Sequence, residues 1–264
     1  MVGDERFIRS TLQWQPWYEE MAIDQDGHSA LHLAALFGHA PVARAILETD
    51  TVILEDPAPN QYQRTALHLA AQLGHIETVQ TLLDFGADFT VKDCEKEALG
   101  DSPFLLAAFS GYTNVVATFI DRNPSIVTTA TDKLGNFAIN KAASEGHLDT
   151  VEFLLAKGAL VDQRGYRGRT PVMLASQHGH FDVVKTLIEQ YRADIFFKDF
   201  SPFGDMAIHL AAFNGHCEIV EYFLKLRKDL RVAKNECGHT VLQLASAQRQ
   251  PGVVRLLHQQ GAKV

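Results

Sequence analysis

Thr65-Ala-Leu-His-Leu-Ala-Ala71 occurs again, almost unchanged, at Ser29–Ala35 and at Met206–Ala212. Degenerate copies fill the intervals, at Ser102–Ala108, Phe137–Ala143, Thr170–Ser176 and Thr240–Ser246. Subtracting successive first positions gives steps of 36, 37, 35, 33, 36 and 34 residues. A period of this size predicts a stacked repeat protein, in which each unit buries its apolar face only against its neighbours.

Each copy carries the signals for two short helices. A hydroxyl residue begins five of the copies, where it can accept a hydrogen bond from the first free amides of a helix: Ser29, Thr65, Ser102, Thr170 and Thr240. Nine residues later a glycine such as Gly38 or Gly74 can take the left-handed conformation that ends a helix. An apolar stretch at three- and four-residue steps then predicts the second helix of the unit.

This unit resembles the ankyrin repeat, with its Thr-Pro-Leu-His and Gly-His signatures. The resemblance implies an all-α, ankyrin-type solenoid of helix-turn-helix units with protruding β-hairpin-like turns. It also implies protein recognition on a concave side, without catalysis. The first His of each unit is implied to bond to neighbouring turns, and the second to support the turn between helices.

The resemblance covers residues 24–264 as seven repeats, with approximate bounds 24–59, 60–96, 97–131, 132–164, 165–200, 201–234 and 235–264. Residues 1–23 are expected to form an incomplete N-terminal capping half-repeat. The seventh unit shows no clear polar extra helix, although terminal repeats need a polar outer face. We therefore expect either further domains of the same longer chain or a capping partner.

The net charge and the cysteine content of the chain limit which classes of partner and which cellular compartments are expected. The net charge is 24 − 32 = −8, which argues against a nucleic-acid partner, because phosphate contacts need a basic field. Three cysteines without a CxxC pair indicate a reducing, intracellular compartment, cytoplasmic or nuclear. The uncharged stretch 102–120 is long enough to cross a bilayer, but it contains the turn Gly111–Asn114, so membrane insertion is not expected.

The candidate chemistry is sparse. Histidines seven residues apart, such as His32 and His39, recur because the unit recurs, and His178 and His180 flank Gly179 without a converging set of Cys or carboxylate ligands. No nucleophile elbow or phosphate-binding loop is present. We expect no metal, no cofactor and no enzyme activity.

The candidate binding residues lie where the repeats differ from one another, at the turn tips and just after each Ala-Ala pair. Large apolar, aromatic and arginine side chains there favour binding hot spots: Phe37, Tyr62, Arg64, Leu73, Phe109, Tyr166, Arg167, Arg169, His178, Phe203 and Phe213. The alternative is that some of these side chains pack against the next turn.

The phenylalanines at 196, 197, 200 and 203 crowd the turn between units five and six. We expect some of them to pack inward and a partner groove to lie there, with Arg167 and Arg169 beside it. This arrangement suits a peptide with apolar anchors and an acidic residue. The sequence therefore predicts a non-enzymatic module that binds a partner protein segment on its concave face. The alternative is a targeting or regulatory segment of a larger enzyme, channel or secreted effector.

Overall fold

The computed structural model describes residues 27–49, 54–58, 63–93 and 100–262. The expected half-repeat at 1–23 and the candidate Tyr62 lie outside these ranges. Within them the regular structure is helical, apart from isolated bridge residues such as the antiparallel pair Lys234 and Thr240. None of the described helices is long and apolar enough to cross a membrane.

The chain forms two compact units, Met1–Leu134 and Gly135–Val264, called here the N-terminal and the C-terminal unit. The described helices of the N-terminal unit are α2 (Ala30–Leu36), α3 (Ala40–Leu47), α4 (Ala66–Gln72), α5 (Ile76–Asp84), α6 (Pro103–Phe109), α7 (Thr113–Arg122) and α8 (Ile126–Thr129). Except for the single turn of α8, they form three pairs, each joined by a short turn.

The C-terminal unit contains four such pairs and two 3-10 turns. Its elements are α9 (Ala138–Glu145), α10 (Leu148–Ala156), η2 (Tyr166–Gly168), α11 (Pro171–His178), α12 (Phe181–Glu189), α13 (Ala207–Asn214), α14 (Cys217–Leu226), η3 (Lys228–Val232), α15 (Val241–Ala247) and α16 (Pro251–Gln259).

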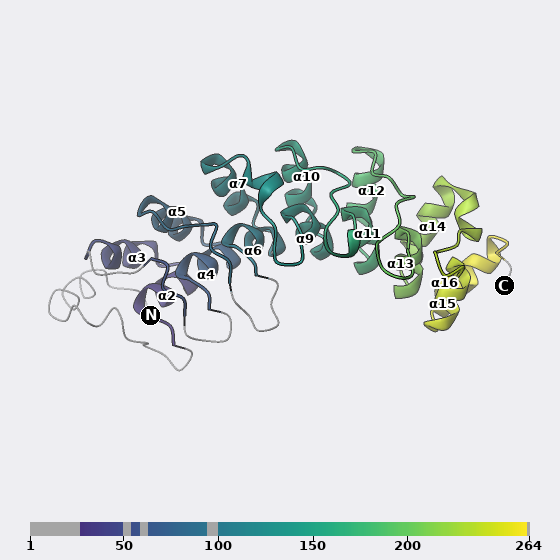
Figure 1. The fold of residues 1–264 in the computed structure, drawn as a ribbon, viewed down its shortest axis with the longest axis horizontal. Coiled ribbons are helices and arrows are strands. Elements are labelled where there is room, and N and C mark those ends of the chain that lie inside the picture. Colours follow the sequence, from purple (N-terminus) through teal and green to yellow (C-terminus); the bar gives the residue numbers. More distant parts are fainter. Residues whose placement is uncertain (1–26, 50–53, 59–62, 94–99, 263–264) are drawn as a thin grey trace. The chain divides into compact units, whose positions relative to one another are not determined.

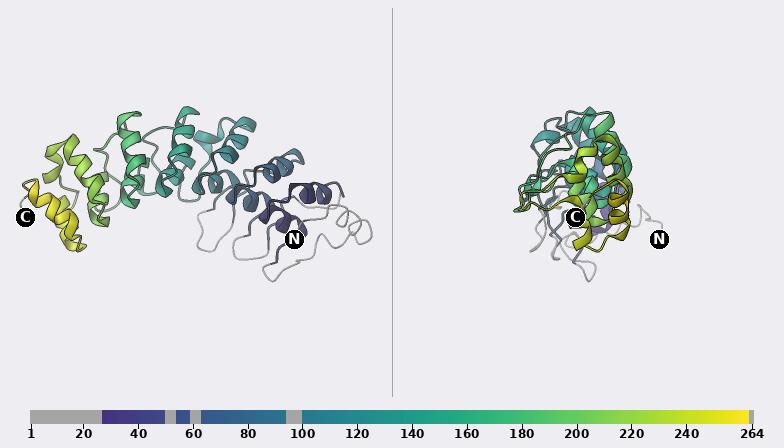
Figure 2. Two further views of the ribbon diagram at one scale, coloured as in Figure 1. Left: turned by 180° about the vertical axis from the view of Figure 1, so that it is seen from behind. Right: turned by 90° about the vertical axis from the view of Figure 1, so that its right-hand side faces the viewer.

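Within each unit the helices form two rows (Figure 1). The first helices pack side by side, α2 on α4 on α6 in one unit, and α9 on α11 on α13 on α15 in the other. The second helices form the other row, which Figure 2 shows from behind. The paired alanines of the first helices, such as Ala70 and Ala71 or Ala211 and Ala212, are fully buried in the seam. Their small size lets the neighbouring helices approach closely, and a larger side chain would overpack the seam.

The helix starts follow the predicted capping pattern. The hydroxyls of Ser29, Ser102 and Thr240 accept hydrogen bonds from the amide three residues later, at 3.5, 3.4 and 3.3 Å. The buried hydroxyl of Thr170 differs, since it has no hydrogen-bond partner in the structure. The proline that follows Thr170 occupies the first helical position, where no amide hydrogen is needed.

The glycines between paired helices leave room for a ring from the next pair. Gly146 has a φ of 79°, and a Cβ built on it would lie 2.3 Å from Nδ1 of His180. The ring of His180 is fixed there because its Nε2 donates to the carbonyl of Ser144 at 2.7 Å. The same arrangement joins Gly38 to His75 and Gly179 to His216. The second His of the unit therefore holds consecutive pairs together.

We expect Gly146→Ala to lower the free energy of unfolding by about 2 kcal/mol, since it adds both a left-handed strain and a clash. Gly238→Ala is the matched control, because Gly238 has the same φ of 79° and nothing within 4 Å of its built Cβ. Urea denaturation should show a smaller decrease in the free energy of unfolding for Gly238→Ala than for Gly146→Ala. Equal losses would mean that the ring contact contributes nothing.

The last described helix pair, α15 and α16, carries few exposed apolar side chains. No large apolar side chain is exposed between 241 and 262. The exposed residues on α15 and α16 are mainly polar, among them Gln243, Gln248, Arg249, Arg255, His258 and Gln259. A polar outer face is typical of a terminal repeat, and the expected further domains or capping partner stay a prediction.

Candidate partner-binding groove

A groove of about 540 Å³ opens in the C-terminal unit, between α11 and α13 and the turns that precede them. This volume falls within the range of sites that hold a ligand or a large side chain. The lining residues come from the turn at 165–169, the turn at 199–205 and the ends of the two helices: Arg167, Arg169, Gln177, Phe200, Ser201, Pro202, Phe203, Asp205, Leu210, Phe213 and Asn214.

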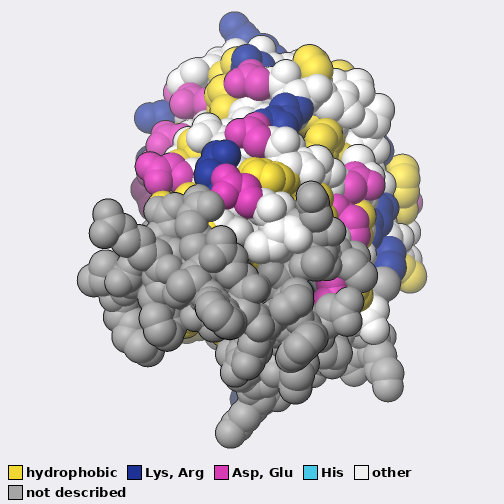
Figure 3. Space-filling model, turned by 90° about the vertical axis from the view of Figure 1, so that its left-hand side faces the viewer, with side chains coloured by type: hydrophobic (Ala, Val, Ile, Leu, Met, Phe, Trp, Pro, Cys, Tyr) yellow, Lys and Arg dark blue, Asp and Glu magenta, His cyan; other side chains and the backbone are white. Residues whose placement is uncertain are grey.

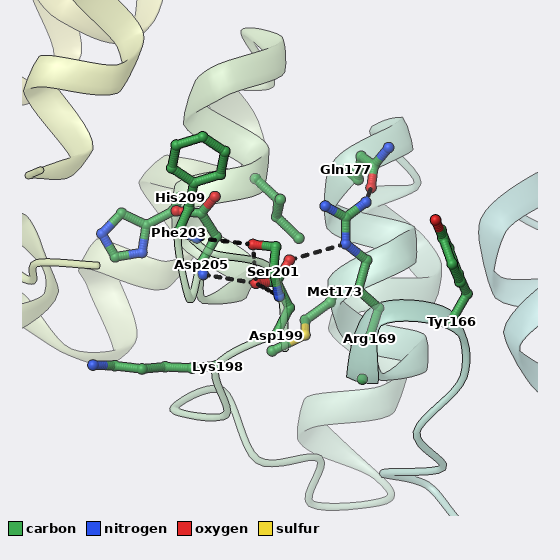
Figure 4. A network of polar contacts seen from close by, with 12 residues as sticks. Tyr166, Arg169, Met173, Gln177, Lys198, Asp199, Ser201, Phe203, Asp205 and His209 are labelled. Carbon is green, nitrogen blue, oxygen red and sulfur yellow. Dashed lines mark hydrogen bonds and ion pairs between the residues drawn. The ribbon is translucent and has the colours of Figure 1, made fainter. Parts of the chain in front are cut away.

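The carboxylate of Asp199 organises the turn at 199–205 (Figure 4). Its Oδ1 accepts hydrogen bonds from Ser201 Oγ at 2.6 Å, from the Ser201 amide at 3.2 Å and from the Asp205 amide at 3.0 Å. Its Oδ2 pairs with Nε of Arg169 at 3.1 Å. The side chain of Asp199 is 0% exposed. These bonds fix the shape of the turn that carries Phe200 and Phe203.

The guanidinium groups of Arg169 and Arg64 are engaged within the chain, and their contact with a partner stays a prediction. Arg169 pairs with Asp199 and also donates to Oε1 of Gln177. In the N-terminal unit, Arg64 pairs with Asp93 at 3.0 Å and donates to Gln72 at 2.8 Å. Both arginines are mostly buried and connect a first helix to the following turn.

Arg167 is different, because its side chain is exposed at the rim of the groove. Its guanidinium carbon lies 5.1 Å from the ring centroid of Tyr166, within the range of a cation–π contact. Its backbone has a φ of 56°, and its carbonyl accepts a hydrogen bond from the Phe200 amide at 2.6 Å. The tip that carries Arg167 is therefore held by the next turn.

Exposed aromatic rings form the apolar wall of the groove. Phe203, in the turn at 199–205, is 52% exposed, and Phe213, on α13, is 40% exposed. The carbonyl of Phe203 accepts from the Glu236 amide at 2.7 Å, which fixes the backbone under its ring. Leu210 lies one turn before Phe213 on α13, so both side chains lie on one face of the helix.

Three of the clustered phenylalanines contact arginines, but they do not pack inward as expected: Phe196, Phe200 and Phe203 are exposed and Phe197 is half-buried. Arg164 lies between the rings of Phe197 and Phe200, at 4.5 and 4.7 Å from their centroids. Phe200 also fills the space over Gly168, where a Cβ would approach its ring to 2.4 Å. Phe196 lies under Arg227 at 4.8 Å. Phe200 is nevertheless 71% exposed, so its ring contacts Arg164 and Gly168 on one side and adds to the apolar lining of the groove on the other.

The remaining predicted residues lie apart from the groove lining. Tyr166 is exposed beside Arg167, and exposed His178 stacks on His180 with ring centroids 6.4 Å apart. Burial is the main cause that lowers the pKa of His178, which favours its neutral form at pH 7. In the N-terminal unit, Phe37 and Leu73 are exposed directly after α2 and α4, and Phe109 is exposed as the last residue of α6.

The sequence did not identify three residues whose contacts support the groove. Asp199, Ser201 and Arg164 carry its hydrogen bonds and ring contacts. A signal was present, because Arg64 with Gln72 and Arg169 with Gln177 share one spacing around their helices. The Arg–Gln pair occurs in only these two units, and in both of them the arginine pairs with an aspartate of the following turn, Asp93 or Asp199.

Histidines and acidic residues form no metal site in the part of the chain that the structure describes. The first His of a unit instead bonds to the next turn: Nε2 of His32, His68 and His209 donates to the carbonyls of Arg64, Asp101 and Ala233. In the view of Figure 3, Lys and Arg side chains of the described residues alternate with Asp and Glu rather than forming a basic surface.

Comparisons with known proteins agree with this architecture. The family model described as ankyrin repeats (3 copies) matches residues 3–93, 104–199 and 191–264, and a second ankyrin repeat model matches 67–120. The crystal structure of the human ASB11 ankyrin repeat domain superposes with a TM-score of 0.72 at 24% identity, covering 88% of this chain and 98% of that chain.

Two curated relatives illustrate the contexts in which similar repeats occur. The probable E3 ubiquitin-protein ligase XBOS32 of Oryza sativa subsp. japonica is 33% identical over 118 residues, which is 45% of this chain and 23% of that protein. A transient receptor potential cation channel subfamily A member 1 homolog of Caenorhabditis elegans is 30% identical over 169 residues, 63% of this chain and 13% of that protein. The matches thus span about a quarter or less of these relatives. The family models cover most of the sequence, and the chain belongs to the ankyrin repeat family.

Proposed function

We propose that this chain is a non-enzymatic protein-recognition module. Its binding face consists of the turn tips and the exposed side of the first helices, which the family resemblance identifies as the concave side. The observation that carries the proposal is the groove between α11 and α13, where Phe203 is exposed on a hydrogen-bonded turn and Phe213 on a helix. Aromatic rings held in this way are typical of binding hot spots.

The test is the triple variant Phe200→Ala, Phe203→Ala and Phe213→Ala, which removes three exposed rings that line the groove. Each hot-spot aromatic contributes about 2 kcal/mol or more, so partner capture should fall by at least about 30-fold. Affinity capture with mass spectrometry compares the wild type with this variant, and circular dichroism checks that helical content is unchanged.

The matched control is Leu160→Ala, Phe196→Ala and Leu226→Ala, which removes three exposed apolar side chains outside the groove. This control should retain its partners. If the groove variant keeps the same partners as wild type, the assignment of the face is wrong.

A second candidate function is a targeting or regulatory segment of a larger protein. Its support is that the chain matches only 13–23% of the length of relatives named as a ligase and a channel. A transcript that encodes no further domain would count against it. The exposed free thiols of Cys217 and Cys237 support a reducing, intracellular compartment. A mutation-sensitive turnover in a hydrolase and transferase screen would contradict the non-enzymatic proposal.

A further inference from the structure

The charged groups around the groove differ in how far they are already neutralised. The carboxylate of Asp199 accepts three hydrogen bonds and pairs with Arg169. Arg169 also donates a hydrogen bond to Gln177. Asp205 accepts a hydrogen bond from Asn235 at 2.9 Å. For Arg167, the structure gives a ring contact with Tyr166 and no carboxylate within the described residues. The rim therefore offers one exposed cation next to an apolar wall.

We propose that the groove takes an extended peptide with one large apolar or aromatic side chain and a neighbouring Asp or Glu. The apolar side chain lies against Phe203 and Phe213, and the carboxylate pairs with Arg167. This specificity rests on the proposed function, and it names the chemistry of the partner segment. Arg169 contributes by holding Asp199 and not by contacting the peptide.

The local charge at the rim, rather than the net charge of the whole chain, supports this occupant. The whole chain carries a net charge of −8, so an acidic peptide gains nothing from long-range attraction. At physiological salt, however, fields are screened beyond about 8 Å. A carboxylate at the rim therefore senses Arg167 more than the distant acidic residues, and the local charge determines which peptides bind.

The backbone geometry makes the arginine a prearranged contact. The carbonyl of Arg167 is bound by the Phe200 amide, and the adjoining Gly168 is buried under the ring of Phe200. The turn is thus fixed before a partner arrives, which lowers the entropy lost on binding. Only the side chain of Arg167 remains to be ordered.

The experiment uses the full chain and a random dodecapeptide library displayed on phage. Enriched peptides are synthesised in three forms, with the acidic residue as selected, with the matching amide, and with lysine. Binding is measured by fluorescence anisotropy for wild type, Arg167→Asn and Arg167→Asp. Asn and Asp tolerate the left-handed conformation of this residue better than other side chains do.

Arg192→Asp is the matched control. Arg192 is an exposed arginine of the same unit with a φ of 62°, and it does not line the groove. The substitution therefore makes the same change of charge in the same backbone conformation.

We expect Arg167→Asp to lower the affinity for the acidic peptide by about tenfold and to raise the affinity for the lysine peptide. Arg192→Asp should change neither affinity by more than about twofold. Arg167→Asn should remove the preference for the acidic over the amide peptide. Equal responses of Arg167→Asp and Arg192→Asp, with binding still lost in Phe213→Ala, would overturn the acidic specificity and leave the proposed function standing. If wild type enriches no peptide, both the specificity and the proposed peptide-binding function fail.

Discussion

Replacing Asp199 with Ala should lower the free energy of unfolding by about 3 kcal/mol and abolish binding in the groove. The substitution leaves the mostly buried guanidinium of Arg169 without its counter-charge and removes the acceptor for the amides of Ser201 and Asp205. Breaking a buried pair on one side is costly, because the remaining charge stays buried and unpaired. Urea denaturation measures the free energy of unfolding, and fluorescence anisotropy with a selected peptide measures binding in the groove.

Asp93→Ala is the control for this effect. Asp93 makes the same pair with Arg64 and accepts from the Asp101 amide at 2.7 Å, but it belongs to the N-terminal unit. Because repeat stability is roughly a sum of unit and interface terms, Asp93→Ala should cost a similar free energy and leave peptide binding unchanged. Asp199→Asn keeps an acceptor oxygen and should fall between wild type and Asp199→Ala. A loss below about 1 kcal/mol in Asp199→Ala would refute the role assigned to this carboxylate.

The helices were predictable from the sequence because their signals are local. Cap hydroxyls, closing glycines and the three- and four-residue apolar spacing act within a few residues of one another. The capping bonds at Ser29 and Thr240 and the left-handed Gly146 and Gly179 show these signals in the structure. Stacking repeats the same local solution, so one recognised unit predicts the next.

The groove was only partly predictable, since its polar contacts join residues about 30 positions apart. The sequence predicted a partner groove at the turn of Phe196, Phe197, Phe200 and Phe203, with Arg167 and Arg169 beside it. The structure has a groove lined by Phe200, Phe203 and both arginines, and partner binding in it stays a prediction. The sequence could not distinguish Arg167 from Arg169, which are two residues apart in the same turn. Their difference comes from Asp199, thirty residues later, whose carboxylate reaches Arg169 and not Arg167. Periodicity identifies exposed positions, but partners across the stack need the fold.

His68 illustrates how a repeated residue depends on its proton. Its Nε2 donates to the carbonyl of Asp101 at 3.2 Å, and its Nδ1 accepts from the Thr65 amide at 3.2 Å. A proton on Nδ1 would oppose that amide and break the cap of α4. Burial of the ring is the main cause that lowers the pKa of His68 from 6.5 to about 4.

The neutral form of His68 should therefore stabilise the fold above about pH 6.5 and lose this contribution as the pH falls toward 4. Between these values the unfolded chain binds more protons than the folded chain, so the free energy of unfolding decreases with decreasing pH. At pH 5 the expected loss is about 2 kcal/mol relative to pH 7.5. The measurement is urea denaturation at both pH values.

The chain itself supplies the control substitution. Asn140 and Gln243 occupy the position of His68 in other copies, where each accepts from the cap amide, at 3.1 and 2.9 Å. Asn140 also donates to the carbonyl of Gln163 at 2.9 Å, so an amide reproduces both bonds without titrating. His68→Asn should keep most of the stability at pH 7.5 and lose about 2 kcal/mol less than wild type on going to pH 5. Parallel losses in the two proteins would mean that the acid sensitivity arises elsewhere, because all other titrating groups are common to both.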